Sequence, residues 1–314
     1  MSDKTIDVPL TAEVRNRKGI GLPANTGEPI NIPRGPGALR TVILMARVTF
    51  REAARRKILW IAALGGAAFL GLSWAGLHAM IASMSPKLPA INRREGIGMM
   101  LMMVLYAGSM MTSLMAALTS CDTLSGEIAS GTIHAIATKP VRRWCLVLGK
   151  WAGFVAMLTL YVLFVEGGSM GISWLETRYF PPHSFAVLGL IWLQAILLLG
   201  VTMACSTRFS ALTSGAVTLG LYGLAFVGGW IEQFGALRHV KTCVDLGIVA
   251  SLVMPSDALW RRAAFRVQPP LLGAAGVSPF SSTLVPSPAV VAYAAIYAIL
   301  ALILAQILFE HRDL

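Results

Sequence analysis

Six long apolar runs divide this chain, and they constrain its fold more than any other feature. A helix needs about 20 largely apolar residues to cross a bilayer, and five of the runs reach that length without interruption. The remaining run, from about Leu146 to Ile172, contains one carboxylate, Glu166. The runs predict six transmembrane helices, at residues 58–84, 98–120, 146–172, 184–206, 209–231 and 288–309.

The composition argues against a soluble globular protein. Hydrophobic residues make up 56% of the 314 residues, the mean hydropathy is +0.69 and only 13% of the residues are charged, whereas soluble domains carry about 25% charged residues. We therefore predict an all-α polytopic membrane protein with a transmembrane domain at residues 58–314. The net charge of +11 would also suit a nucleic-acid ligand, but the positions of the basic residues explain it differently, and we expect no nucleic-acid partner.

The distribution of Lys and Arg predicts the orientation, because cytoplasmic loops retain these residues. With the N-terminus inside, the cytoplasmic segments hold the larger share of the 26 Lys and Arg residues. An even number of crossings then places both termini in the cytoplasm, and anionic lipid headgroups account for the basic charge. Residues 1–37 are polar and rich in Pro and Gly, without the apolar core of a secretory signal, and we expect a flexible cytosolic tail.

Residues 38–57 have the pattern of an amphipathic helix. At 100° per residue the arginines gather on one side and most apolar residues on the other, which predicts a helix lying in the membrane interface. We expect the membrane lipids to be bound at this surface and at the start of the third span. The predicted headgroup contacts are Arg40, Arg47, Arg51, Arg55, Arg142 and Lys150.

The segment between the second and third spans, residues 121–145, is predicted to form a short helix on the cytoplasmic face. Gly126 and Gly131 weaken helix continuity, Thr132 is a good N-cap, and Pro140 ends the helix that Thr132 would begin. This leaves about two helical turns, residues 132–138, between two crossings. A partner that binds this short helix would tilt both neighbouring spans together.

Several residues of this region match the signature of a known family. The run Glu127-x-x-x-Gly131-Thr132, then Lys139-Pro140-Val141-x-Arg143, then Gly149-Lys150 resembles the E-x-x-x-G-T … P-V-x-R … G-K pattern of ABC-2 type transporter permeases, including the subgroup with the permease for nitrous-oxide-reductase maturation. The basic amphipathic stretch resembles the elbow helix of that family. The ending Phe309-x-x-Arg312-Asp313-Leu314 is similar to the ending of many such permeases.

The resemblance implies a six-helix half-transporter in a bacterial cytoplasmic membrane. It would pair with a second permease subunit, identical or not, and with two ABC ATPase subunits. The chain itself would bind no cofactor or metal, and ATP and Mg would bind to the ATPase. The residues implied to couple to the ATPase are Glu127, Gly131, Thr132, Ile133, His134, Pro140 and Arg143.

The sequence also lacks a P-loop, which agrees with a nucleotide site on another subunit. Gly149-Lys150 is the one Gly-Lys pair near a helix start, but Trp144 stands where a P-loop needs its first Gly and Trp151 where it needs Ser or Thr. We therefore expect no enzymatic activity from this chain, with ATP hydrolysed on a separate subunit.

Spans two and five look like the pathway-lining helices of this family. Here they carry hydroxyl groups and no charge over their apolar cores, which favours an amphipathic or lipid-like cargo. Glu166 in span three has two interpretations. An ionisable residue inside a membrane is a candidate functional group, but Glu166 lies about 24 Å beyond Lys150 along a helix of about 1.5 Å per residue, where outer headgroups would hydrate it. The candidate pathway residues are Ser109, Thr112, Ser113, Thr213, Ser214, Thr218 and Glu166.

Two other functional classes fit parts of the sequence. Gly167-x-Ser169-x-Gly171 matches the G-x-S-x-G string of serine hydrolases, so an intramembrane hydrolase using Ser169 is one alternative. The string needs a strand-turn-helix context, and close helix packing explains the same glycines and the pair Gly149 and Gly153. The second alternative is a membrane anchor for a cytosolic complex.

The outer loop, residues 232–287, is too long for a simple turn. Its apolar stretch at residues 246–254 is too short to cross a bilayer, and Ser256 or Asp257 is placed to cap a following helix. That helix would have Leu259, Trp260 and Ala263 on one face. We expect short re-entrant or surface helices in this loop.

Methionine and cysteine usage gives no firm metal site. Seven of the 15 methionines lie in span two, and thioethers bind Cu(I), but no Cys or His accompanies them, which favours packing. The four cysteines form no C-x-x-C pair, so zinc sites and structural disulfides are not expected.

Overall fold

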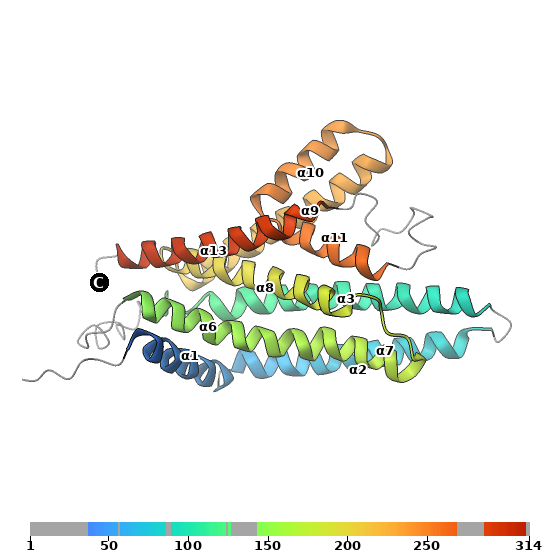
Figure 1. Cartoon of the computed structure of the whole chain (residues 1–314), viewed down its shortest axis with the longest axis horizontal. Helices are drawn as coiled ribbons and strands as arrows, with labels where there is room; N and C mark the ends of the chain where they lie inside the picture. The colour runs from blue at the N-terminus through green and yellow to red at the C-terminus, as the bar shows by residue number, and fades with distance from the viewer. Residues whose placement is uncertain are drawn as a thin grey trace, which may run out of the picture. The chain divides into compact units, whose positions relative to one another are not determined.

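The computed structural model describes residues 37–55, 57–85, 89–123, 125–126, 143–268 and 286–311. All regular secondary structure within these ranges is helical, which confirms the predicted fold class. The described helices belong to one compact unit, Pro36–Leu314, in which several of them run side by side (Figure 1).

Six helices are long and apolar enough to cross a membrane, as the sequence predicts, and one bent helix pair, described below, would add a seventh if it is counted as a single broken span. The predicted and observed bounds differ mainly at three ends. α3 begins at Ala90, earlier than predicted, the third span continues to Thr177, and α9 continues to Leu237. The six are α2 (Lys57–Ser83), α3 (Ala90–Ser120), the continuous span Trp144–Thr177, α8 (Ser184–Ser206), α9 (Ala211–Leu237) and α13 (Ala289–Glu310).

The third span is a single path built from three helical pieces. α6 (Arg143–Val162) leads into a π-helical turn, η2 (Leu163–Gly167), and α7 (Gly168–Thr177) completes the span. A π-helical turn accommodates one extra residue in a helix and is often found at functional sites. In this chain the π-helical turn contains Glu166, the carboxylate that interrupts the predicted apolar run.

The six helices differ in how much of their surface other helices cover. α8 is the most buried and packs against α13, α11 and α3, whereas α2 is the least buried. α2 exposes large apolar side chains along its length, among them Trp60, Ile61 and Leu72. Apolar surface this extensive requires apolar surroundings. The chain is therefore a multi-pass membrane protein.

The first described helix, α1 (Ala38–Arg55), packs along the start of the third span. Two glycines of α6 allow the close approach. A Cβ atom at residue 153 would lie 2.8 Å from the carbonyl oxygen of Ala46, and one at Gly149 would collide with Met45. The predicted close packing at Gly149 and Gly153 is confirmed, and its partner is α1.

Two short helices, α10 (Lys241–Val253) and α11 (Ser256–Val267), lie between α9 and α13 as the sequence predicts. Their axes are bent by 106° at the break between them. Leu259, Trp260 and Ala263 of α11 are all buried, so the predicted apolar face is confirmed.

The capping prediction for α11 is wrong. Ser256 and Asp257 lie inside the helix, and Pro255 is the N-cap without a side-chain hydrogen bond. Asp257 turns instead toward Arg261, one helical turn later.

Candidate functional site

Most of the predicted coupling residues lie outside the described residues. These are Glu127, Gly131, Thr132, Ile133, His134 and Pro140, and the predicted anchor Arg142. Arg143 is the first residue of α6, and its side chain also lies outside the described part of the chain. The structure therefore describes the two helix ends that flank the coupling segment, and these ends are joined by a specific contact.

Lys150 makes the contact between the two flanking helix ends. Its ammonium nitrogen donates a hydrogen bond of 2.9 Å to the carbonyl oxygen of Thr123, just beyond the end of α3. The residue is only 7% exposed. The predicted headgroup contact of Lys150 is thus wrong, because its charge is used inside the protein, where a cation near a helix C-terminus is favourable.

The arginines of α1 behave differently from Lys150. Arg40, Arg47, Arg51 and Arg55 are all exposed, while Thr41, Thr49 and Ala53 are buried. The apolar residues Leu39 and Ile43 are also exposed. α1 therefore has one face packed against α6 and a second, amphipathic face that is open.

The predicted pathway residues are mostly buried in this structure. Those of α3 are Ser109, Thr112 and Ser113, and those of α9 are Ser214 and Thr218, while Thr213 is exposed beside its cap residue Ser210.

The α3 hydroxyls are satisfied largely within the bundle. Ser109 donates to the carbonyl of Tyr106 at 2.8 Å and Ser113 to that of Ser109 at 2.8 Å. Gln194 of α8, which no sequence pattern indicated, donates from its amide nitrogen to the Ser113 hydroxyl at 3.0 Å. Its amide oxygen and the Thr112 hydroxyl have no partner among the described residues. The structure thus brings polar groups of α3 and α8 into direct contact in a closed, packed arrangement.

Glu166 lies in the protein interior rather than among hydrating headgroups. Its exposure is 0%, and neither carboxylate oxygen has a hydrogen-bond partner among the described residues. It packs against Gly108 of α3, where an added Cβ atom would lie 2.7 Å from its Oε1. The hydrated interpretation is therefore wrong. A buried carboxyl group of this kind is able to bind a proton or a cationic group.

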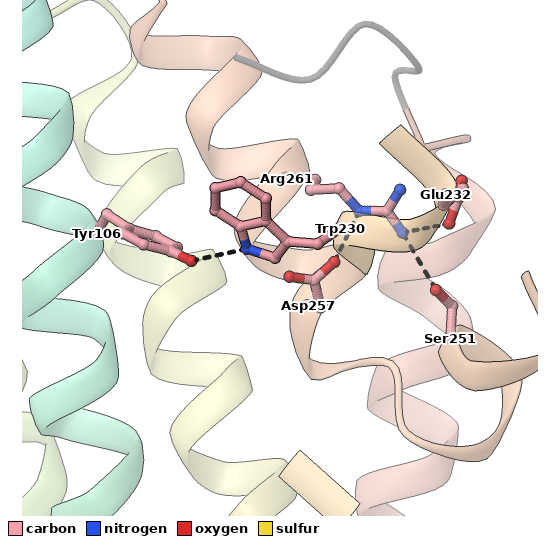
Figure 2. A network of polar contacts seen from close by, with 6 residues as sticks. All are labelled: Tyr106, Trp230, Glu232, Ser251, Asp257 and Arg261. Carbon is pink, nitrogen blue, oxygen red and sulfur yellow. Dashed lines mark hydrogen bonds and ion pairs between the residues drawn. The ribbon is translucent and has the colours of Figure 1, made fainter. Parts of the chain in front are cut away.

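Figure 2 shows a second polar network, which the sequence did not predict. Arg261 of α11 lies between two carboxylates, 2.9 Å from Glu232 of α9 and 2.9 Å from Asp257 of its own helix (Figure 2). Arg261 also donates to the Ser251 hydroxyl of α10 at 3.1 Å. One guanidinium thus joins three helices.

The Arg261 network is almost completely buried, with Arg261 itself only 3% exposed. Burying charges is costly unless they are paired, so the pairing decides how α9, α10 and α11 pack. Next to the network, the Trp230 indole donates to the Tyr106 hydroxyl of α3 at 3.4 Å (Figure 2). The Tyr106 and Trp260 ring centroids are 5.1 Å apart.

The serine of the G-x-S-x-G string has no hydrolase geometry. Ser169 lies in the helix α7, is buried, and donates its hydroxyl to the Val165 carbonyl at 2.7 Å. His78, a histidine near the same end of the bundle, is 3.5 Å from Glu176 instead. Added Cβ atoms at Gly167 and Gly171 would contact none of the described residues, so the close-packing explanation of these two glycines is not met within the described part of the chain.

Two methionines of span two, Met100 and Met111, pack against glycines of α2. The Met111 methyl carbon would lie 3.7 Å from a Cβ atom at Gly65, and the Met100 methyl carbon 3.0 Å from one at Gly76. Flexible thioether side chains fill such notches well. In the described part of the chain, no three His, Cys, Asp or Glu side chains are grouped to hold a metal ion.

Comparison with known proteins adds no relative. No protein-family model matches the chain, and no curated protein matches it.

Proposed function

We propose that this chain is the permease subunit of an ABC-2 type transporter. Two copies, or one copy and a related permease, would assemble with two ABC ATPase subunits that bind ATP and Mg and drive alternating access. The observation that carries the proposal is the contact of Lys150 with Thr123. This contact joins the two helix ends that flank the segment with the family signature.

The packing around that contact supports a mechanical role. α6 is held to the end of α3 by Lys150 and to α1 through Gly149 and Gly153. A force applied at residues 127–142 would therefore be transmitted to three helices at once. Closure of the ATPase pair would then shift the population between two packings of the bundle.

The distribution of charge supports an orientation with both termini in the cytoplasm, and the family resemblance implies that the membrane is a bacterial cytoplasmic membrane. The exposed arginines of α1 would then face anionic cytoplasmic headgroups, on the same side as the coupling segment. The hydroxyl-bearing residues of α3 and α9 would line the pathway, and their lack of charge favours an amphipathic cargo.

The proposal is tested by co-expressing the tagged chain with the ABC ATPases encoded beside it, and measuring which ATPase co-purifies. We expect an ATPase at about one copy per permease. Glu127→Ala should reduce the amount of co-purified ATPase at least several-fold, because it alters the signature ahead of the predicted coupling helix. Glu176→Ala changes a carboxylate at the end of the third span that is farthest from the coupling segment; it is the matched control and should leave co-purification unchanged.

A membrane anchor would give a different result. It would retain cytosolic partners, but the ATP turnover of a co-purified ATPase would not respond to the chain. An absence of any ATPase, or an equal effect of both variants, would contradict the permease proposal.

A further inference from the structure

An apolar pocket lies where α1 meets the membrane-crossing helices. Its volume is about 180 Å³, and its walls come from α1, α2, α3 and the third span. The residues that matter here are Phe50 and Ala54 of α1, Ala63 of α2, and Tyr161. The Tyr161 hydroxyl is directed to the Ala62 carbonyl at 3.4 Å. An apolar cavity is a poor site for water, which needs several polar partners.

The pocket-facing side of α1 borders its arginine-rich side. Residues three or four apart are neighbours on a helix surface, so Arg47 flanks Phe50 and Arg51 flanks Ala54. Both arginines are exposed. Glu52, the one carboxylate of α1, is two residues before Ala54 and so lies on the far side of the helix. The open edge of the pocket is therefore positive, while its interior is hydrocarbon.

We propose that this pocket is a binding site for one anionic phospholipid. An acyl chain would enter the cavity between α1 and the third span, and Arg47 and Arg51 would bind the phosphate. Guanidinium groups suit phosphate because they donate in a fork that matches its oxygens. A zwitterionic lipid could place its chain equally well but lacks the net negative charge that two exposed arginines attract.

The site would also stabilise the contact between α1 and α6. A lipid that touches Phe50 and Ala54 on one helix and Tyr161 on the other bridges both, beside the glycine contacts at residues 149 and 153. The proposal needs neither an ATPase nor a transported cargo, and so does not depend on the proposed function.

Native mass spectrometry of the full chain, released from an uncharged detergent, tests the proposal. The probes are phosphatidylglycerol and phosphatidylcholine with identical acyl chains. We expect one phosphatidylglycerol molecule to be retained in preference to phosphatidylcholine. Because each arginine near an anionic headgroup contributes about a fivefold preference, Arg47→Gln with Arg51→Gln should remove about a 25-fold preference.

A control double variant and two pocket variants distinguish binding of the headgroup from binding of the acyl chain. Arg208→Gln with Arg238→Gln removes two exposed arginines from the ends of α9 and should change nothing. Ala63→Phe fills the pocket and should remove the retained molecule of either lipid, and Ala54→Phe, at an exposed position of α1, is the second pocket variant if Ala63→Phe does not fold. Glycerol phosphate, which has the phosphate headgroup but no acyl chain, should not compete with phosphatidylglycerol for the site.

Three results would overturn the proposal. They are equal retention of the two lipids by the wild-type chain, an equal loss of preference in both arginine double variants, and unchanged retention when the pocket is filled. Co-purification of an ATPase is measured separately, so failure of this site and failure of the proposed function are distinguishable.

Discussion

Arg261 makes one ion pair that its helical spacing predicts and two contacts that only helix packing creates. Its nearest sequence signal is the carboxylate four residues earlier, Asp257, which by helical spacing predicts one ion pair. The pairing of Arg261 with Glu232 and Ser251 arises from the packing of α9, α10 and α11. No local sequence pattern indicates it. Lys150 behaves in the same way, since its position at the start of a span favours a headgroup contact, but the structure pairs it with Thr123.

Removing the guanidinium should destabilise the protein strongly. Arg261→Met would leave two buried carboxylates facing each other, and breaking a buried pair in this way costs about 3–5 kcal/mol. The measurement is the unfolding free energy in mixed micelles. Adding Glu232→Gln and Asp257→Asn to the same variant should recover most of the lost unfolding free energy, because the triple variant buries no unpaired charge. If the single and triple variants were equally unstable, the pairing would not be the cause.

At the scale of elements, glycine placement decides which helices touch. Gly153 and Gly171 lie in the same span, and both are part of Gly-x-x-x-Gly pairs. Gly153 meets the backbone of α1, whereas none of the residues that the structure describes lies near a Cβ atom added at Gly171. The sequence predicts that small residues favour close packing but does not indicate which pair has a partner.

Gly153→Leu should therefore weaken the contact between α1 and α6. The added side chain would meet the Ala46 carbonyl oxygen at its first carbon, and overpacking of this kind costs about 1–3 kcal/mol. Gly171→Leu is the control and should change stability by far less. Protease cleavage after the α1 arginines, compared between the two variants, reports whether α1 has detached. Equal cleavage of both variants would show that the glycine contact does not hold α1.

The packing of neighbouring helices also explains how the Glu166 side chain is accommodated. The apolar run that contains it predicts a span, and the structure confirms the span but inserts a π-helical turn at this point. The turn and the absence of a side chain at Gly108 together make room for the carboxyl group. Gly108→Ala should therefore lower stability by about 1–3 kcal/mol through overpacking, measured by thermal unfolding. Combining it with Glu166→Ala should relieve most of that loss, and a purely additive loss would contradict this explanation.

For the whole molecule, the proposed orientation makes a prediction about its two faces. Arg208 precedes α9 and Arg238 follows it, so they should lie on opposite sides of the membrane. In a cysteine-free background, Arg238→Cys should react with a membrane-impermeant maleimide in intact cells. Arg208→Cys should react only after the cells are permeabilised. The reverse labelling pattern would show that the topology is opposite to the proposed one. The coupling segment would then lie on the outer side of the membrane, where no cytosolic ATPase reaches it.

The sequence by itself determined the six spans, the amphipathic first helix and the short helices between α9 and α13. It did so because the apolar length needed to cross a bilayer and the 3.6-residue period are local properties of the chain. Only the tertiary structure decided the burial of Lys150 and Glu166, the choice of α1 as the partner of Gly149 and Gly153, and the Arg261 network. These depend on which helix faces are brought together, and between membrane helices of similar hydrophobicity that choice rests on shape and on the pairing of a few polar groups.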